Sequence, residues 1–474
     1  MQRLAAWTRL RLGRARTSKL RLIWHDTVAG SLARDGLALC ERHTGRDTVW
    51  RLERLRSAPG APFSPGQPAP LVAEAATLDA LNLGAITPLV PVAACDAALR
   101  SFAPASTADG LRVRILTGTL RAVAGEQPVC RLLLAGAPGQ IEALALALAQ
   151  EVRLAVPPAA LAAEALATAG REVAPRALGA PMLARSMTAS DAFSAVAGHL
   201  TDVVLHWAPH AEAGVAPEPV HQMRVALRRL RSAQSLFRRA LTTTTADAIR
   251  HDLRLLLNVL GPCRDWDVFV AGNGRAAAAC LPDDRPLARL LAAAERKRQD
   301  SYSALREQLG SPAFRCLGLR LACLAAFRPW EALAEPAAPA PHAVPVLAYA
   351  AQALDRRWKR VLEAGDDIAA LPPHELHALR IEGKRLRYAA EFFAPLFPGH
   401  GARRFLRRIA TVQDRLGRLN DNTVAGQLMA DLGGAGRSYA SGLVRGFIAA
   451  GQRGAHSKME RAWKKFRRTD SFWH

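Results

Sequence analysis

A segment near the middle of the chain concentrates positive charge. Residues 221 to 232 read HQMRVALRRLRS and hold one histidine and four arginines without an acidic residue. Guanidinium groups form paired hydrogen bonds to phosphate or carboxylate oxygens, and imidazole adds a donor that depends on its protonation. These residue types together indicate an anion-binding segment.

The spacing predicts that most of these cations share one face of a helix. At about 100° per residue, four of them project within a band roughly 80° wide, beside an apolar stripe: His221, Arg224, Arg228 and Arg231. The band runs about 15 Å along the helix axis, which is longer than a single orthophosphate. The pattern therefore favours a linear anion with repeated charges.

The cationic segment recurs later in the chain. HALRIEGKRLRY places His377, Arg380, Lys384, Arg385 and Arg387 at an offset of 156 residues from His221, Arg224, Arg228, Arg229 and Arg231. The same offset relates Gly261 to Gly417 and Asp265 to Asp421. An unchanged offset across two separate motifs predicts a tandem duplication of one helical unit. We expect the two helices to line one groove with opposed basic rows.

The alternative is a solvated helix face whose arginines pair with nearby acids. No Asp or Glu occurs from Pro219 to Ala246, which argues against this alternative in the first half. The second half has Glu375, Glu382 and Glu391. Four further arginines, which we expect to support the site, then precede the next acid, Asp414: Arg403, Arg404, Arg407 and Arg408.

The remaining polar residues of the motifs have two interpretations each. A neighbouring polyanion would favour the imidazolium form of His221 and His377, whereas either residue could instead belong to the core or to a helix start. Asp265 and Asp421 follow glycines and either orient or charge-balance an arginine of the row, or cap a helix. We favour the first role for Asp265.

Composition supports a polyanionic partner. The 474 residues include 64 Lys+Arg and 41 Asp+Glu, which gives a formal net charge of +23. Nucleic acid, an anionic membrane and inorganic polyphosphate all fit this charge.

Cysteine spacing and apolar run length indicate the compartment. The seven cysteines show no C-x-x-C spacing, and we therefore expect a cytoplasmic protein. The apolar stretches are too short to cross a membrane, so we expect no membrane span. The basic N-terminus is either a solvated arm or a targeting signal.

Two changes of pattern divide the chain. Short β-rich runs with turn signals occupy residues 20 to 135, and long Ala-, Leu- and Arg-rich segments follow from residue 140. We predict an α+β domain over residues 1–175 and an all-α helical domain over residues 185–470. A Pro-rich break at residues 328–345 separates the helical domain into halves of about 185–328 and 345–470.

The repeated motifs resemble those of the CHAD family of conserved-histidine α-helical domains. HQMRVALRRLRS, LGPCRDWDV, HALRIEGKRLRY and LGRLNDN match both halves of its pattern in order, over residues 185 to 470. The resemblance implies a bundle of two pseudo-symmetric halves with a basic groove that binds inorganic polyphosphate, often at polyphosphate granules. The resemblance also implies that ten residues bind the polyphosphate: His221, Arg224, Arg228, Arg229, Arg231, His377, Arg380, Lys384, Arg385 and Arg387.

Residues 1–175 resemble, more faintly, the CYTH or triphosphate-tunnel family, in the stretches WHDTVAGSLARDGLALCERHTGRDTVWRLERL and CRLLLAGAPGQIEALALALAQEV. That family binds divalent metal through glutamates on two strands. Here no acid precedes Asp26, and the later strand reads Arg131, Leu132, Leu133 and Leu134. We therefore expect a degenerate, barrel-like antiparallel domain without metal or catalysis.

The sequence leaves three functions to compare. We expect a non-enzymatic polyphosphate-binding protein without a cofactor. The alternatives are a metal-dependent triphosphatase, which phosphate release from tripolyphosphate would reveal, and a nucleic-acid-binding protein. No phosphate loop, dinucleotide Gly pattern or Gly-x-Ser-x-Gly motif occurs, and HELH at 374 to 377 lacks a third zinc ligand. The sequence does not indicate an oligomeric state.

Overall fold

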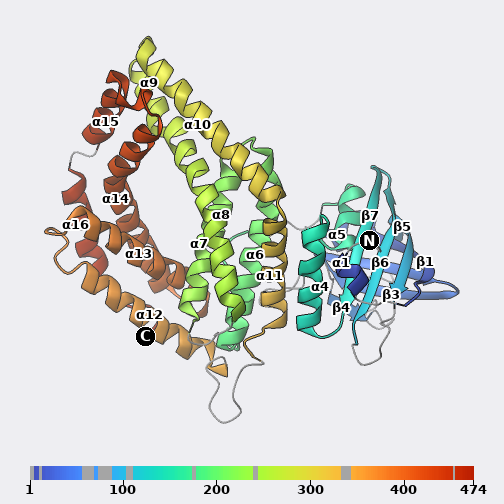
Figure 1. Ribbon diagram of the computed structural model, residues 1–474. Coiled ribbons are helices and arrows are strands. Elements are labelled where there is room, and N and C mark those ends of the chain that lie inside the picture. Colours follow the sequence, from blue (N-terminus) through green and yellow to red (C-terminus); the bar gives the residue numbers. More distant parts are fainter. Residues whose placement is uncertain are drawn as a thin grey trace. The chain divides into compact units, whose positions relative to one another are not determined.

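The protein is described by a computed structural model, which covers residues 5–9, 13–55, 69–72, 88–102, 110–157, 159–172, 178–238, 244–331, 343–451 and 454–474. The chain divides into two compact units. Met1–Gly179 and Arg315–Phe327 form the first, and Ala180–Phe314 and Arg328–His474 form the second. Figure 1 shows strands in the first unit and helices throughout the second.

The first unit is built on an antiparallel sheet, as the β-rich pattern predicted. Its strands in the described residues are β1 (Arg16–Thr27), β2 (Leu37–Thr44), β3 (Asp47–Arg54), β4 (Ala69–Val72), β5 (Leu89–Phe102), β6 (Arg112–Ala122) and β7 (Gly125–Ala135). They pair in the order β4-β3-β2-β1-β5-β6-β7. In the described residues the sheet is open, with β4 and β7 at its edges, so the expected barrel-like shape is met only loosely.

Alternation along the strands gives the sheet two apolar faces. On one face Trp24, Cys95 and Leu120 pack with Leu166 of α5 (Leu161–Thr168). On the other face Val113 packs in a separate cluster with residues of α4 (Pro138–Glu151) and of α1 (Ala5–Arg9). Because successive side chains of a strand point to opposite faces, one sheet can hold helices on both. A short helix, α2 (Ser31–Arg34), lies between β1 and β2 in the chain.

The second unit confirms the all-helical prediction and shows the repeat. Its first half contains α6 (Ala189–Ala213), α7 (Glu218–Leu236), α8 (Thr244–Val268), the π-helix η2 (Phe269–Gly274), α9 (Arg275–Cys280) and α10 (Arg285–Gly310). Its second half contains α12 (Val346–Ala364), α13 (Pro373–Phe393), the 3-10 turn η4 (Ala394–Leu396), α14 (His400–Asp431), the 3-10 turn η5 (Ala435–Arg437), α15 (Tyr439–Gly451) and α16 (Ala455–Arg467). Helices α6, α7 and α8 begin within one residue of the 156-residue offset from α12, α13 and α14.

The helix between the halves, α11 (Pro312–Phe327), lies mostly within the first unit. There Arg315 donates to the carbonyl of Ala149 at the end of α4. Gln150 donates its amide to Cys316 Sγ at 3.2 Å. In the described residues no single helix is long and apolar enough to cross a membrane, although the bent pair α10 and α11 passes the same test together.

The two motif helices are amphipathic, and their apolar stripes form the core of the second unit. On α7, Met223, Leu227 and Leu230 are buried, and α13 buries Leu379 and Leu386. At the end of α7, the Phe237 ring stacks on Tyr349 of α12 and meets Phe393 of α13 edge-on. This packing holds the two halves together and leaves the polar faces of α7 and α13 to form the site.

Candidate anion-binding site

The polar face of α7 lines a cavity of about 340 Å³, which we call the first cavity. His221, Arg224 and Arg228 line it, together with Arg264 and Asp265 of α8. The rest of the wall comes from Val225 and Val268 of the same two helices, from η2 and α14, and from Arg380 of α13. The structure thus gathers the row predicted on α7 with a residue of the predicted partner row.

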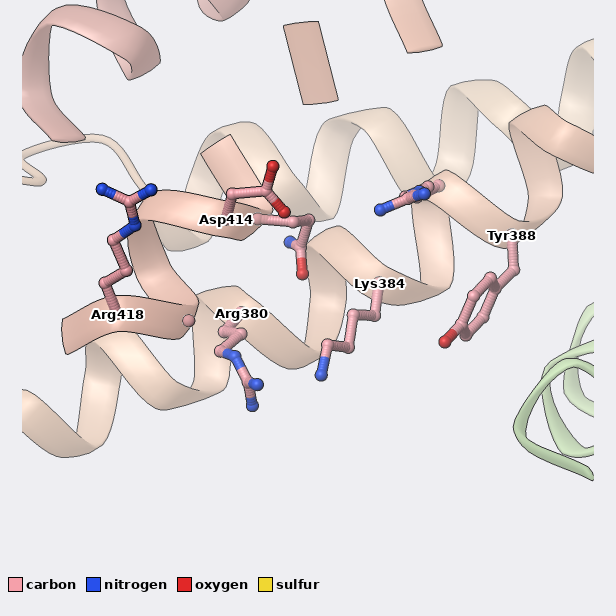
Figure 2. A pocket seen from close by; sticks show the side chains of 8 residues that line it. Arg380, Lys384, Tyr388, Asp414 and Arg418 are labelled. Carbon is pink, nitrogen blue, oxygen red and sulfur yellow. The ribbon is translucent and has the colours of Figure 1, made fainter. Parts of the chain in front are cut away.

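The polar faces of α13 and α14 line a second cavity of about 440 Å³. Its lining residues are Arg380, Lys384, Arg387, Tyr388, Gln413, Asp414, Gly417 and Arg418. Figure 2 shows the Arg380, Lys384 and Tyr388 side chains projecting from the same side of α13. Because Arg380 lines both cavities, the two cavities adjoin at this side chain.

The two basic rows lie close enough to interact electrostatically. Burial and four neighbouring positive charges together lower the pKa of the Lys384 ammonium from 10.5 to about 7. Burial is the largest cause, and the charges are those of Arg228, Arg380, Arg224 and Arg387. Two of these charges, Arg224 and Arg228, belong to α7. The rows predicted on α7 and α13 therefore face a common region, where they repel each other.

Arg224 shows how the glycine motif helps to place a cation. Its Nη1 atom lies 3.2 Å from the position that a Cβ of Gly261 would occupy, so the guanidinium packs against the bare backbone of α8. Burial lowers the pKa of Arg224, and the Asp265 carboxylate opposes that shift. Burial in turn raises the pKa of Asp265, against the effect of Arg224, Arg264 and Arg228. Asp265 therefore lies beside the row, where its charge opposes those of the arginines.

His221 lies in a cationic environment. Burial lowers its pKa, and Arg264, Arg224 and Arg228 lower it as well, while Glu218 acts in the opposite direction. In the free protein these surroundings favour the neutral imidazole over the imidazolium. A bound polyanion would reverse that balance, because it would screen the guanidinium groups and attract the proton.

Two of the predicted ligands share one carboxylate. Glu391 accepts from Arg229 at 2.5 Å and from Arg387 at 2.8 Å, so it links α7 to α13. The Arg229 guanidinium also lies 5.9 Å from the centre of the Tyr388 ring. Arg387 lines the second cavity, whereas Arg229 lines neither. Arg229 thus has a structural role in joining the helices.

Three other predicted ligands lie outside both cavities. Arg385 pairs with Glu382, which also lies 3.8 Å from Arg357 of α12. Arg231 and His377 are exposed, and neither lines a cavity. The structure therefore does not bring these three residues together with the rest of the predicted set.

The four arginines expected to support the site lie near the start of α14 and line neither cavity. Arg404 pairs with Asp470 at 2.8 Å, and Arg408 donates to Thr469. Arg403 donates to His400, and Arg407 is exposed. The side chain of Asp421, in α14, lies outside the described residues.

Several cavity residues were missed by the sequence analysis. Arg264 and Arg418 are neighbours of Asp265 and Gly417 in the repeated glycine motif, so their position in the sequence was a usable signal. Gln413 and Tyr388 carry no charge and do not belong to the repeated pattern. Only the packing of α13 against α14 shows that they line the second cavity.

Comparison with known proteins places the helical part in a family. Residues 195–430 match the family model of the CHAD domain. The crystal structure of the CHAD domain from the plant Ricinus communis is 29% identical with a TM-score of 0.52, and the match covers 61% of this chain and 96% of that one. PptA from Streptomyces chartreusis is 18% identical with a TM-score of 0.44, and the match covers 59% of this chain and 100% of that one. No curated protein matches the chain.

The resemblance of residues 1–175 to the triphosphate-tunnel family remains a prediction. For the helical part, the family match agrees with the duplicated motifs and with the repeated order of the helices that carry them. Residues 195–430 of this chain are a CHAD domain.

Proposed function

We propose that the helical unit binds inorganic polyphosphate in the two adjoining cavities. The carrying observation is that cations of α7 and α13 lie around Lys384, where burial and then the repulsion from these cations lower the pKa of its ammonium to about 7. One carboxylate lines each cavity, Asp265 in the first and Asp414 in the second, against four or more basic side chains. A linear polyanion would relieve this repulsion along the whole row.

The test removes charge where the two rows meet. The variant R224Q/R228Q/R380Q/K384Q should lose retention of long-chain polyphosphate at moderate salt, because each phosphate contact contributes to counterion release. The measurement is a titration with labelled polyphosphate at several salt concentrations. The same variant should no longer co-localise with stained polyphosphate granules in cells.

A matched control removes the same charge elsewhere. The variant R289Q/R296Q/R403Q/R407Q changes four exposed arginines of α10 and α14 that line neither cavity. It should keep most of the affinity for polyphosphate. Equal loss in the two variants would show that net charge, and not the cavities, determines binding.

We assign binding, and no catalytic step, to the helical unit.

The first unit contains a cluster of arginines. Burial lowers the pKa of Arg42, and Arg51 and Arg114 lower it further, so arginines from three strands lie near one another. Glu53 lies in the same region. Within the described ranges, no group of three His, Cys, Asp or Glu residues is placed to hold a metal.

A further inference from the structure

Gln413 of α14 is a buried amide in the wall of the second cavity. It is 6% exposed, and among the residues that the structure describes neither its amide nitrogen nor its amide oxygen has a hydrogen-bond partner. A buried polar group without a partner costs free energy, and most such groups in proteins are paired. The residue lines the cavity together with Arg380, Lys384 and Arg418.

The packing of α13 keeps this amide in place. A Cβ at position 383 would overlap the Nε2 atom of Gln413, so Gly383 is the residue that lets α14 bring the amide against α13. Gly383 itself is buried and lies between Glu382 and Lys384 in the motif. The glycine and the glutamine therefore form a matched pair in the wall of the cavity.

The positive charges around Gln413 indicate a role for its neutral amide. The surrounding side chains Arg380, Lys384 and Arg418 supply positive charge, and burial and repulsion already disfavour the charged form of Lys384. A further cation would add to that repulsion. A neutral amide instead supplies a directed N–H donor that a phosphate oxygen can accept without increasing the charge of the cluster.

We propose that Gln413 is a neutral phosphate ligand, which donates its amide N–H to a phosphate group held in the second cavity between Arg380, Lys384 and Arg418. This inference rests on the proposed function and deepens it. The arginines and the lysine provide attraction along the chain, and Gln413 fixes where one phosphate lies. Sequence comparison of the two motif helices would not reveal it, because Gln413 lies on a third helix.

The experiment separates a hydrogen bond from a charge. Titrations with labelled polyphosphate at several salt concentrations are made on the parent chain, on Q413L and on K384Q. A hydrogen bond to a charged group predicts that Q413L weakens binding about tenfold or more. The slope of log affinity against log salt should stay unchanged in Q413L, because no cation is lost. In K384Q the slope should fall by roughly one phosphate contact.

Thermal unfolding gives a second readout that a merely structural glutamine would not produce. Replacing an unpaired buried amide by an apolar side chain of similar size should keep or raise the unfolding midpoint of Q413L. G383A provides an independent variant, since the added methyl group displaces the amide while all the cations remain. It should weaken binding in the same way, again without a change in the salt slope.

The outcomes are distinct. A parent chain that does not bind polyphosphate overturns the proposed function together with this inference. A parent that binds, with Q413L binding equally well, overturns the role of Gln413 alone. A salt slope that falls in Q413L as it does in K384Q also overturns it, because the amide would then act only by arranging the cations.

Discussion

The free protein disfavours the charged form of Lys384. Burial, together with four neighbouring arginines on α7 and α13, brings its pKa to about 7. The unfolded chain would hold this proton up to its ordinary pKa of 10.5. Between these two values the unfolded state binds more protons, so the contribution of Lys384 makes the stability of the free protein rise with pH.

Binding of polyphosphate should show the opposite dependence on pH. A bound polyanion favours the ammonium form, so binding above pH 7 requires Lys384 to take up a proton. We expect the affinity to fall as pH rises from about 7.5 to 9, by at most about tenfold per pH unit, the limit for one linked proton. Calorimetry in two buffers of different ionisation enthalpy would measure the proton uptake directly.

The control for this prediction is K384R. Arginine stays charged throughout this range, so the affinity of the variant should depend less on pH above 7.5 than that of the parent, because the contribution of Lys384 is removed. The terminal phosphates of polyphosphate lose their second proton near pH 6, as phosphomonoesters do. This loss is therefore nearly complete in this window. A pH dependence of K384R equal to that of the parent would assign the titration to another group.

At the scale of elements, one carboxylate joins the two motif helices. Glu391 of α13 pairs with Arg229 of α7 and with Arg387 one turn before it on α13. The side chains of Arg229 and Glu391 are largely buried. Removing a carboxylate from such a position leaves two guanidinium groups close together without their shared partner, which is costly in a partly buried environment.

E391Q should therefore lower stability while it improves binding. We expect the free energy of unfolding to fall by about 1–3 kcal/mol. This is less than the cost of breaking a fully buried pair, because Arg387 is partly exposed. Arg387 lines the second cavity, so its release should tighten polyphosphate binding and steepen the salt dependence by about one contact. Thermal unfolding and salt titrations measure the two effects.

E375Q serves as the control for E391Q, because Glu375 is exposed near the start of α13 and pairs with no arginine in the described residues. It should change neither the unfolding midpoint nor the salt slope by a measurable amount. Weaker polyphosphate binding in E391Q would instead mean that Glu391 holds Arg387 in its binding position.

The sequence predicted the elements better than the roles of their residues. Periodicity identified α7 and α13 as amphipathic, and the constant offset predicted the two halves. The sequence could not show which arginines are neutralised, because Arg229 pairs with a residue 162 positions away. Arg385 directly follows Lys384, and the rotation of about 100° per residue places it outside the cavities. Arg231 shares a face with Arg224 and Arg228 but lies further along α7, and it lines neither cavity.

At the scale of the whole molecule, composition predicted a polyanionic partner but could not choose one. The net charge of +23 attracts DNA as well as polyphosphate. In the first unit, the strand pattern predicted the antiparallel sheet, whereas its open form depends on strand pairing, which local pattern does not specify. The choice between the two polyanions depends on where the charges lie, since a duplex contacts exposed cations and a bare phosphate chain can enter a cavity.

The two charge-removal variants test that distinction with duplex DNA. The cations changed in R224Q/R228Q/R380Q/K384Q line cavities of about 340 and 440 Å³, too small to admit a duplex. Those changed in R289Q/R296Q/R403Q/R407Q are exposed. The cavity variant should lose polyphosphate but keep most DNA binding, and the surface variant should do the reverse. On the parent chain, polyphosphate at matched phosphate concentration should leave most of the labelled DNA bound, because the two ligands contact different cations. If both variants lose both ligands in parallel, the total charge governs binding, and the chain is a general polyanion binder without a polyphosphate site.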